Sequence, residues 1–443
     1  MKIKIAFLSF FLLLFASAYS QSINKPNLDS LFSVLEQKNK AMGSLAIVKN
    51  DKLLYANAIG YRVISDREKM KASSQTKYRV GSISKMFTAV MIFQLIDKGK
   101  LTLETPLYKY LPDFPNAKTM TIGNLLNHRS GLHNFTSRVD YEDWSLIPKT
   151  QKEMLDIIAQ GGSDFLPGTK TQYSNSNYYV LGYLLEKITK RPYARNLKER
   201  ISDKIGLSNT DVGSKTDLFK GESYSYEYRD KWIQKTETNI LSIAGGAGCI
   251  VSTPSDLCRF IEALFHLKLI SKNSLDKMTT VVEDCGMGIF PIVLENKKCW
   301  GHSGTIDGFS SALVFFPQDS LAMACCSNAL LPSKNYMFNG SLRIFYGLDY
   351  NIPDFKRVNV PQDLLNAYVG LYSTKTFPLK INITTDSIGL VAQATGQPSF
   401  ALEAVTENKF KFDQANLTIH FNREKKELVL SQAGAVFLFT KEE

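Results

Sequence analysis

Apolar residues recur with helical spacing at three places along the chain. The spacing predicts one helix over residues 28–38 and a long buried helix over residues 82–98. A third helix is predicted from Thr253, which suits an N-cap because Pro254 follows at the first helical position. Between about residues 100 and 240 the chain is punctuated by prolines, and this pattern predicts short helices and loops.

Strand-like apolar runs lie at both ends of this helical region. Two pairs of runs predict β-hairpins, residues 44–48 with 53–58 and residues 310–316 with 321–327. Residues 334–347 are predicted to form a closing helix packed on the second hairpin. Strands at both ends with helices between them indicate an α+β domain, in which an antiparallel sheet is flanked by helices and carries an all-α insert.

The chain changes character near Val358, where short runs of alternating apolar and polar residues begin. These runs cover residues 379–383, 388–392, 400–405, 409–412, 417–421, 428–430 and 436–439. Their regular spacing predicts a small all-β barrel or sandwich of about 80 residues. We therefore place one domain at residues 21–355 and a second, without any catalytic constellation, at residues 356–443.

The first 20 residues have the three parts of a secretory signal peptide. Two lysines form the basic start, residues 5–16 form the apolar core, and Ala18 and Ser20 are the small residues before a cut at Gln21. The alternative is a retained membrane anchor, but the apolar run is shorter than the about 20 residues that a span needs. The pattern predicts a secreted or periplasmic protein with no stable membrane span after cleavage.

Composition and charge narrow the classes further. Of 443 residues, 44% are hydrophobic and 21% charged, which is typical of a globular protein and excludes a disordered or fibrous one. The net charge of +11 raises the question of a nucleic-acid partner. The basic residues are scattered, however, and the densest group, residues 187–200, interleaves with glutamates, so we expect solvated surface and no nucleic acid.

All six cysteines lie between Cys249 and Cys326 without the spacing of a zinc site, so we expect mostly buried thiols. A disulfide is possible in an exported protein, but its pairing cannot be assigned. No HExxH, P-loop or GxGxxG motif is present, and no metal or nucleotide cofactor is implied.

Three short motifs carry residues with catalytic chemistry. Ser82 and Lys85 stand at i and i+3, so they share a helix face, and a lysine with a lowered pKa can take a hydroxyl proton. Tyr173 can relay a proton, and the amide of Asn175 can hold a substrate carbonyl. Each pair alone is also consistent with a helix cap or an ordinary loop.

The third motif is Gly301-His302-Ser303-Gly304-Thr305. Its two glycines allow a ligand to approach an edge strand closely. A single histidine of this kind is more often structural than catalytic, so this motif too is weak in isolation.

The order and wide separation of the three motifs resemble the serine β-lactamase and penicillin-binding-protein superfamily, with its SxxK, YxN and KTG-type elements. Further segments that resemble this superfamily lie at residues 78–82, 121–132, 165–168, 244–246 and 252–257. The resemblance covers about residues 27–350 and is closest to the class C β-lactamase-like branch. It implies a β-lactamase/transpeptidase-like fold.

The resemblance also implies a role for each motif residue. Ser82 would be the acylated nucleophile, Lys85 would activate it, and Tyr173 would share the proton transfers. The backbone N–H groups of Ser82 and Thr305 would form the oxyanion hole. The substrate-binding residues would be Asn175, His302, Ser303, Gly304 and Thr305.

His302 stands where many relatives carry lysine, and a largely neutral histidine offers less charge to a substrate carboxylate. This departure and the C-terminal β-domain resemble DD-peptidases, D-aminopeptidases and esterases more than dedicated β-lactamases. The other histidines, His128, His133, His266 and His420, are interpreted as packing or hydrogen-bonding residues.

We therefore expect an exported serine hydrolase that forms an acyl-enzyme and hydrolyses an amide or ester. Its substrate would be a small molecule or peptide, for example a D-amino-acid peptide of the cell wall. The alternatives are a class C-like β-lactamase and a catalytically silent binding protein. The sequence gives no oligomeric state.

Overall fold

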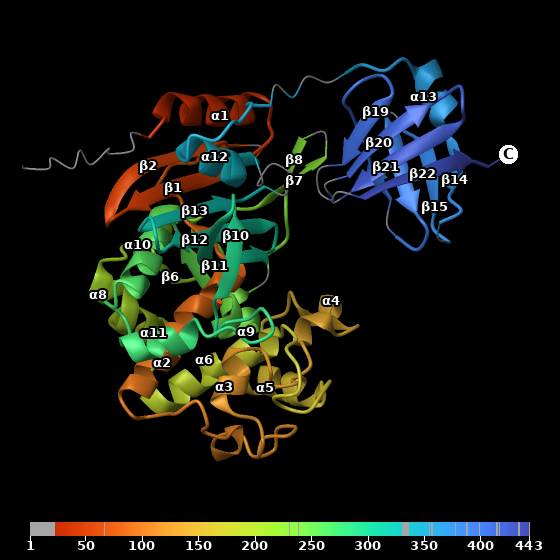
Figure 1. Cartoon of the computed structure of the whole chain (residues 1–443). Helices are drawn as coiled ribbons and strands as arrows, with labels where there is room; N and C mark the ends of the chain where they lie inside the picture. Colours follow the sequence, from red (N-terminus) through yellow and green to blue (C-terminus); the bar gives the residue numbers. More distant parts are fainter. Residues whose placement is uncertain are drawn as a thin grey trace, which may run out of the picture.

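The computed structural model describes residues 23–442 except 66, 230, 238, 330–335, 354, 356, 357, 377, 387, 388, 398, 413, 414, 416, 433 and 434. The predicted signal peptide and its cleavage site lie outside the described residues, as does the start of the predicted helix at 334. Within the described part, an α+β domain precedes an all-β barrel that lies beside it (Figure 1).

A six-stranded antiparallel sheet forms the centre of the first domain, in the order β10-β11-β12-β13-β1-β2. Its strands are β1 (Gly43–Lys49), β2 (Lys52–Ile59), β10 (Phe290–Leu294), β11 (Lys297–Ile306), β12 (Phe309–Phe316) and β13 (Leu321–Ser327). The N-terminal hairpin joins the C-terminal one through β1 and β13, where Ala46 lies opposite Ala324. Both predicted hairpins are confirmed.

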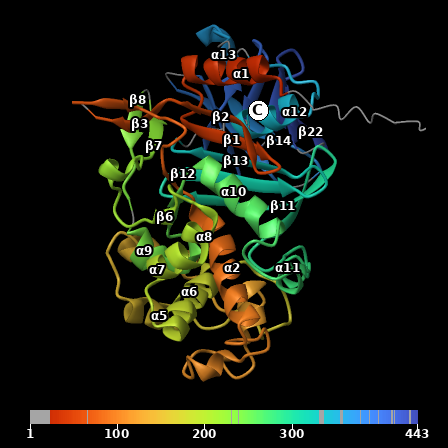
Figure 2. The ribbon, with the colours of Figure 1, turned by 90° about the vertical axis from the view of Figure 1, so that its left-hand side faces the viewer.

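Helices cover both faces of this sheet (Figures 1 and 2). The helices α1 (Lys25–Gln37) and α12 (Ser341–Phe345) lie on one face, and α10 (Pro254–Phe265) lies on the other. Successive side chains of a strand point to opposite faces. Accordingly Leu45 and Ile47 pack with α1, whereas Ala46 and Val48 join the larger core on the α10 side. Thr253 caps α10 as predicted, by accepting from the N–H of Asp256.

The helix α2 (Ser84–Asp97) is the centre of the helical region, and every residue from Ser84 to Leu95 is buried. It lies between α10, where Phe260 stacks on Phe87 at 3.7 Å, and α6 (Asn175–Thr189). A helix that is apolar on all sides needs neighbours on all sides. The remaining helices of this domain are α3 (Ile122–Leu126), α4 (Tyr141–Trp144), α5 (Gln151–Gln160), α7 (Tyr193–Leu197), α8 (Asp203–Ile205), α9 (Ile240–Ala244) and α11 (Lys272–Met278).

Short strands are the feature that the sequence pattern missed. They are β3 (Tyr61–Ile64), β4 (Lys69–Lys71), β5 (Tyr78–Arg79), β6 (Asp211–Val212), β7 (Tyr226–Arg229), β8 (Lys231–Gln234) and β9 (Ile250–Ser252). The expectation of helices and loops alone between residues 100 and 240 is therefore wrong, because β6, β7 and β8 lie there. Strands of two to four residues are too short to show an alternating pattern.

The C-terminal region is a nine-stranded antiparallel sheet in the order β17-β16-β15-β14-β22-β21-β20-β19-β18. Its elements are α13 (Gln362–Tyr368), β14 (Gly370–Ser373), β15 (Lys380–Thr385), β16 (Leu390–Ala394), β17 (Phe400–Ala401), β18 (Glu403–Ala404), β19 (Lys409–Phe412), β20 (Leu417–Asn422), β21 (Glu427–Gln432) and β22 (Ala435–Lys441). Only Leu402 separates the two end strands β17 and β18, so the sheet closes into a barrel. The predicted run at 400–405 is thus two strands, and α13 and β14 were not predicted.

Polar contacts of Lys40 and Lys411 join the barrel to the first domain. Lys40 lies 3.6 Å from Glu403 of β18, and Lys411 Nζ lies 3.2 Å from the hydroxyl of Tyr336. Tyr336 begins the single helical turn (Tyr336–Gly340) that leads into α12.

The sequence predicted mostly buried thiols, and the structure confirms this prediction. All six cysteines are buried with free thiols. Among the residues that the structure describes, no helix has the length and apolar content needed to cross a bilayer.

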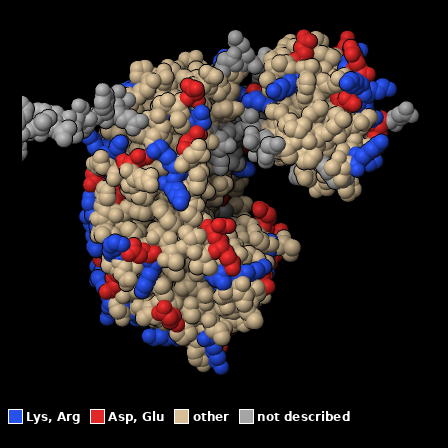
Figure 3. Space-filling view, viewed as in Figure 1, with Lys and Arg blue, Asp and Glu red and all other residues tan. Residues whose placement is uncertain are grey.

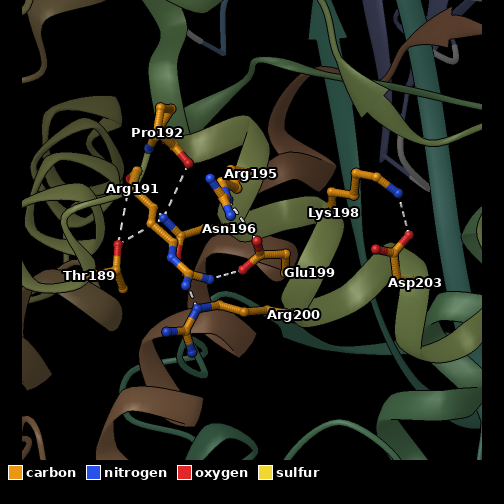
Figure 4. A network of polar contacts seen from close by, with 9 residues as sticks. All are labelled: Thr189, Arg191, Pro192, Arg195, Asn196, Lys198, Glu199, Arg200 and Asp203. Atoms are coloured by element: carbon orange, nitrogen blue, oxygen red, sulfur yellow. Dashed lines mark hydrogen bonds and ion pairs between the residues drawn. The ribbon is translucent and has the colours of Figure 1, made fainter.

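The densest basic stretch is matched by nearby carboxylates. Arg191 and Arg195 both pair with Glu199, and Lys198 pairs with Asp203 (Figure 4). Charges of both signs are interspersed over the face drawn in Figure 3. This is the arrangement expected of ordinary solvated surface.

Candidate active site

Ser82 lies in a tight turn between β5 and α2. The turn (Gly81–Ile83) is a 3-10 helix rather than the first turn of α2 itself. Gly81 has a φ of +52°, which favours glycine, and a Cβ there would lie 2.9 Å from the N of Thr305. A Cβ on Gly304 would lie 2.0 Å from the carbonyl O of Val80. The two glycines therefore let β11 lie directly against the serine turn.

Lys85 occupies the next turn and is fully buried. Its Nζ lies 2.9 Å from Ser82 Oγ, 2.7 Å from Asn175 Oδ1 and 2.9 Å from the carbonyl O of Ala247. No ion pair of Lys85 with a carboxylate occurs among the described residues. Burial without a compensating charge holds the pKa of Lys85 well below its usual value of 10.5.

Tyr173 approaches Ser82 from the segment before α6. Its hydroxyl donates to Ser82 Oγ at 2.8 Å, and burial raises its pKa above the usual value. The ring of His128 lies 4.4 Å from the Tyr173 ring, and His128 Nδ1 accepts from the backbone N–H of Ser174 at 3.2 Å. His128 therefore supports the tyrosine from behind, as its interpretation as a packing residue predicted.

Asn175 is the first residue of α6 and is held on both sides. Its Oδ1 accepts from Lys85, and its Nδ2 donates to the hydroxyl of Thr136 at 3.1 Å. Its backbone N–H donates to the side-chain O of Asn134 at 3.0 Å. Asn134 and Thr136 were not predicted, since a loop 40 residues upstream carries no signal of contact with α6.

The third motif lies on β11 and alternates between two faces. Ser303 and Thr305 are exposed, whereas His302 and Gly304 are buried. The Nδ1 of His302 lies 2.5 Å from the carbonyl O of Ser303, and the ring of Phe290 meets the His302 ring edge-on at 5.0 Å. Burial, assisted by nearby Lys85, lowers the pKa of His302 to about 3, so the imidazole is neutral at physiological pH.

Two cavities meet at Ser82 and Thr305. The first, of about 700 Å³, is mixed in character and includes Asn175, Glu142 and Lys235. It lies between α4 and the β7–β8 hairpin, on the side where the surface is notched beneath the barrel (Figures 1 and 3). The second, of about 610 Å³, is lined by Tyr173 and His302 together with the apolar side chains Phe290, Ile292, Leu294, Val314 and Phe338.

Arg79 is a buried residue of the site to which the sequence assigned no role. It ends β5, three residues before Ser82, and its Nη1 lies 2.5 Å from Asp307 Oδ2. Its Nη2 lies 2.9 Å from Glu237 Oε2. Because Asp307 follows β11 directly, this pair ties the serine turn to the strand that carries Thr305.

The structure thus brings together all the motif residues that the sequence singled out. Three other histidines lie elsewhere: His133 is 3.0 Å from Asp164, His266 is 3.7 Å from Asp51, and His420 is exposed on β20. Within the described residues, no group of three or more His, Cys, Asp or Glu side chains is placed to hold a metal ion.

A serine in contact with a buried lysine and a tyrosine, at the edge of an antiparallel sheet with a helical insert, defines the class of active-site serine hydrolases. The β-lactamase family model matches residues 29–339, and the chain belongs to this family. It is a serine hydrolase of the β-lactamase and penicillin-binding-protein superfamily.

Particular relatives extend this assignment. Penicillin-binding protein 4* of Bacillus subtilis (strain 168) is 26% identical, and the match covers 90% of this chain and 93% of that protein. The teichoic acid D-alanine hydrolase of Staphylococcus aureus is 31% identical over 52% of this chain and 55% of that protein. The D-amino acid amidase of Ochrobactrum anthropi SV3 has a TM-score of 0.64 and 26% identity, over 73% of this chain and 99% of that structure.

Proposed function

We propose that the protein hydrolyses D-aminoacyl amides or esters through an acyl-enzyme on Ser82. The observation that carries the proposal is the set of contacts around the buried amine of Lys85. These contacts determine which atom can take the serine proton.

The three neighbours of Lys85 Nζ differ in what they can donate. Asn175 Oδ1 and the carbonyl O of Ala247 can only accept hydrogen bonds. A neutral amine has two N–H bonds and one lone pair, so the two N–H bonds go to these acceptors. The lone pair then faces Ser82 Oγ at 2.9 Å, within reach for proton transfer. Burial lowers the pKa of Lys85 well below 10.5, and this shift favours the neutral form.

Acylation then proceeds in two proton transfers. Ser82 Oγ attacks the substrate carbonyl carbon while its proton passes to Lys85 Nζ, and the carbonyl O becomes an oxyanion at the N–H groups of Ser82 and Thr305. When the bond to the leaving group breaks, the leaving atom takes a proton from Tyr173 O–H, and Tyr173 recovers one from the Lys85 ammonium. Water reverses these transfers in deacylation and releases the acid.

The position of Tyr173 indicates which part of the substrate each of the two cavities would hold. The acid that protonates the leaving group must contact it, and Tyr173 lines only the cavity that contains His302. The leaving group therefore lies in that apolar cavity, and the acyl group lies beside Asn175. The acyl cavity contains the exposed carboxylate of Glu142, which suits an acyl group with a free ammonium.

The neutral His302 supports the same substrate class. A lysine here would offer a fixed positive charge to a carboxylate on the leaving group, and His302 with a pKa of about 3 does not. This favours hydrolysis of a D-aminoacyl group over removal of a free C-terminal residue or opening of a β-lactam. The proposed specificity for D-amino acids is based on the relatives, two of which are named as a D-alanine hydrolase and a D-amino acid amidase.

Covalent labelling tests the nucleophile. We expect one fluorophosphonate adduct on the intact protein, mapping to Ser82, and none in Ser82→Ala. Lys85→Ala should label far more slowly, whereas Lys187→Ala, which removes an exposed amine on α6, should label normally. Equal labelling of Ser82→Ala and the wild type would overturn the proposed mechanism.

Substrate panels test the chemistry. We expect D-alanine p-nitroanilide and D-alanyl esters to be hydrolysed at least about tenfold better, in kcat/KM, than their L counterparts. Fast turnover of nitrocefin would instead identify a β-lactamase, and an absence of all turnover and labelling would identify a silent binding protein.

We also propose that the protein is exported, on the strength of its N-terminal segment alone. Mass spectrometry of the protein recovered outside the cytoplasm should give the mass of a chain that begins at Gln21. A cytoplasmic protein of full length would contradict this.

A further inference from the structure

Tyr173 lies on a segment that has no regular structure of its own. Residues 170–174 belong to no helix or strand, and Tyr173 is 38% exposed. Its hydroxyl must nevertheless stay 2.8 Å from Ser82 Oγ, because a displacement of about 1 Å can cost about 10²-fold in rate. The segment therefore needs a contact that fixes it from outside.

His128 contacts this segment on both sides of Tyr173. Its carbonyl O accepts from the backbone N–H of Gln172 at 2.9 Å, and its ring Nδ1 accepts from the backbone N–H of Ser174 at 3.2 Å. The centres of the His128 and Tyr173 rings lie 4.4 Å apart. One residue thus bonds to the chain immediately before and immediately after the tyrosine and packs against its ring.

His128 is itself well anchored, in the segment that follows α3. It is buried, and Asn177 of the neighbouring helix α6 donates through Nδ2 to His128 Nδ1 at 3.2 Å (Figure 1). Its φ of +58° is uncommon for a residue other than glycine, although asparagine and histidine adopt it more readily than most residues do. The anchor is therefore buried and bonded to α6, whereas the segment that it holds is exposed.

The contacts of His128 also determine where its ring proton lies. The backbone N–H of Ser174 and the amide N–H of Asn177 can only donate, so Nδ1 is the acceptor and the proton lies on Nε2. Protonation of Nδ1 would break both bonds. Burial lowers the pKa of His128 well below its usual value of 6.5, so the imidazole is uncharged at pH 7 and keeps this acceptor.

We propose that His128 is a positioning residue for Tyr173, an uncharged hydrogen-bond acceptor that holds the tyrosine hydroxyl between Ser82 and the leaving group. This inference rests on the proposed function, in which Tyr173 protonates the leaving group. Because His128 acts through the tyrosine and not on the substrate, its effect on the rate should appear only in steps that need the Tyr173 proton.

Substitutions of His128 separate the acceptor from the rest of the side chain. In His128→Asn the amide Oδ1 is as many bonds from Cα as Nδ1 is, and asparagine tolerates the positive φ, so the bond to Ser174 can be kept. In His128→Gln the amide lies one bond further out, so this bond is lost. His128→Phe also lacks the acceptor, and it serves if His128→Gln does not fold. His420→Phe, at an exposed position of β20, is the matched control.

The kinetic test compares kcat/KM for two D-alanine substrates, the p-nitroanilide and the p-nitrophenyl ester. His128→Gln should lose about tenfold or more on the anilide, whose leaving nitrogen needs a proton, but less than about twofold on the ester. His128→Asn should recover most of this loss, and His420→Phe should match the wild type on both substrates. In a Tyr173→Phe background, His128→Gln should cause no further loss on the anilide, because no hydroxyl is left to position.

Hydrogen exchange gives a second measurement that does not need turnover. The backbone N–H of Ser174 should exchange faster in His128→Gln than in the wild type or His128→Asn, as measured on a peptide that covers residues 170–176. Unchanged exchange would overturn the positioning role. Faster exchange, in a protein whose wild type neither hydrolyses the anilide nor labels at Ser82, would instead place the failure in the proposed function.

Three kinetic results would also overturn the positioning role. The first is wild-type activity of His128→Gln and His128→Phe on both substrates. The second is an equal loss on the anilide and the ester with slower fluorophosphonate labelling of Ser82, because that pattern would mean a general disturbance of the fold. The third is a further, additive loss on the anilide when His128→Gln is combined with Tyr173→Phe.

Discussion

Replacing Lys85 by methionine should abolish activity, and its effect on stability relative to the wild type should become less favourable as the pH rises. Methionine has a similar length and removes only the amine. Loss of a general base typically lowers the rate by about 10²–10⁴-fold, or about 3–5.5 kcal/mol in activation free energy. The effect should lie in kcat and in the rate of Ser82 labelling.

The stability argument follows from the lowered pKa of Lys85. In the unfolded chain this lysine is protonated below its usual pKa of 10.5, whereas in the folded chain it stays neutral until a much lower pH. The unfolded state therefore binds more protons, and the free energy of unfolding rises with pH by about 1.4 kcal/mol per unit between the folded pKa and 10.5. Methionine removes this penalty at neutral pH.

The substitution also destabilises the folded protein, because two hydrogen-bond acceptors lose the amine of Lys85. Without the amine, Asn175 Oδ1 and the carbonyl O of Ala247 lose a donor, at about 1–3 kcal/mol each. The two effects oppose each other. The penalty on the wild type falls as the pH rises toward 10.5, so Lys85→Met should lose stability relative to the wild type between pH 7 and pH 9.

Urea unfolding at pH 7 and pH 9 measures this difference. Lys187→Met, on the exposed face of α6, is the control and should show no pH-dependent difference from the wild type. If Lys85→Met were destabilised by the same several kcal/mol at both pH values, Lys85 would be a charged structural group, and its assignment as the base would be refuted.

Three further changes test other parts of the site. Tyr173→Phe should slow amides by about 10²-fold but p-nitrophenyl esters much less, because a good leaving group needs no proton; equal loss on both, in steady-state kcat, would contradict its role. Gly304→Ala places a methyl group 2.0 Å from the carbonyl O of Val80, so a lower melting temperature and loss of fluorophosphonate labelling are expected. Arg79→Met removes the buried cation that both Glu237 and Asp307 contact, and should lower the free energy of unfolding by about 3–5 kcal/mol; an unchanged urea midpoint would show that these ion pairs are not needed.

The sequence predicted those parts of the fold and site that are formed by short contiguous segments of the chain. The two hairpins of the main sheet are built on short continuous apolar runs, and each motif places its chemistry within five residues. The prediction that the long helix begins at residue 82 was only approximate. Gly81 adopts a positive φ against β11, so Ser82 lies in a separate turn and α2 begins at Ser84.

The parts that could not be predicted depend on contacts between distant segments. The carbonyl of Ala247 holds Lys85, yet a backbone group leaves no mark in the sequence. Arg79 meets Glu237 and Asp307 only because β5 and the end of β11 are brought together by the fold.

Lys85 and His302 share one property, which is that both side chains are buried. Burial lowers the pKa of both Lys85 and His302, and with a pKa of about 3 His302 is neutral at physiological pH. A neutral His302 adds no positive charge that would repel an ammonium group on the substrate. It also offers no salt bridge to a substrate carboxylate, so under the proposed function selectivity depends on the shape of the two cavities, on hydrogen bonds to Asn175 and on the carboxylate of Glu142. Burial therefore favours Lys85 as the base, and the uncharged His302 supports the proposed preference for an aminoacyl substrate over one with a free carboxylate.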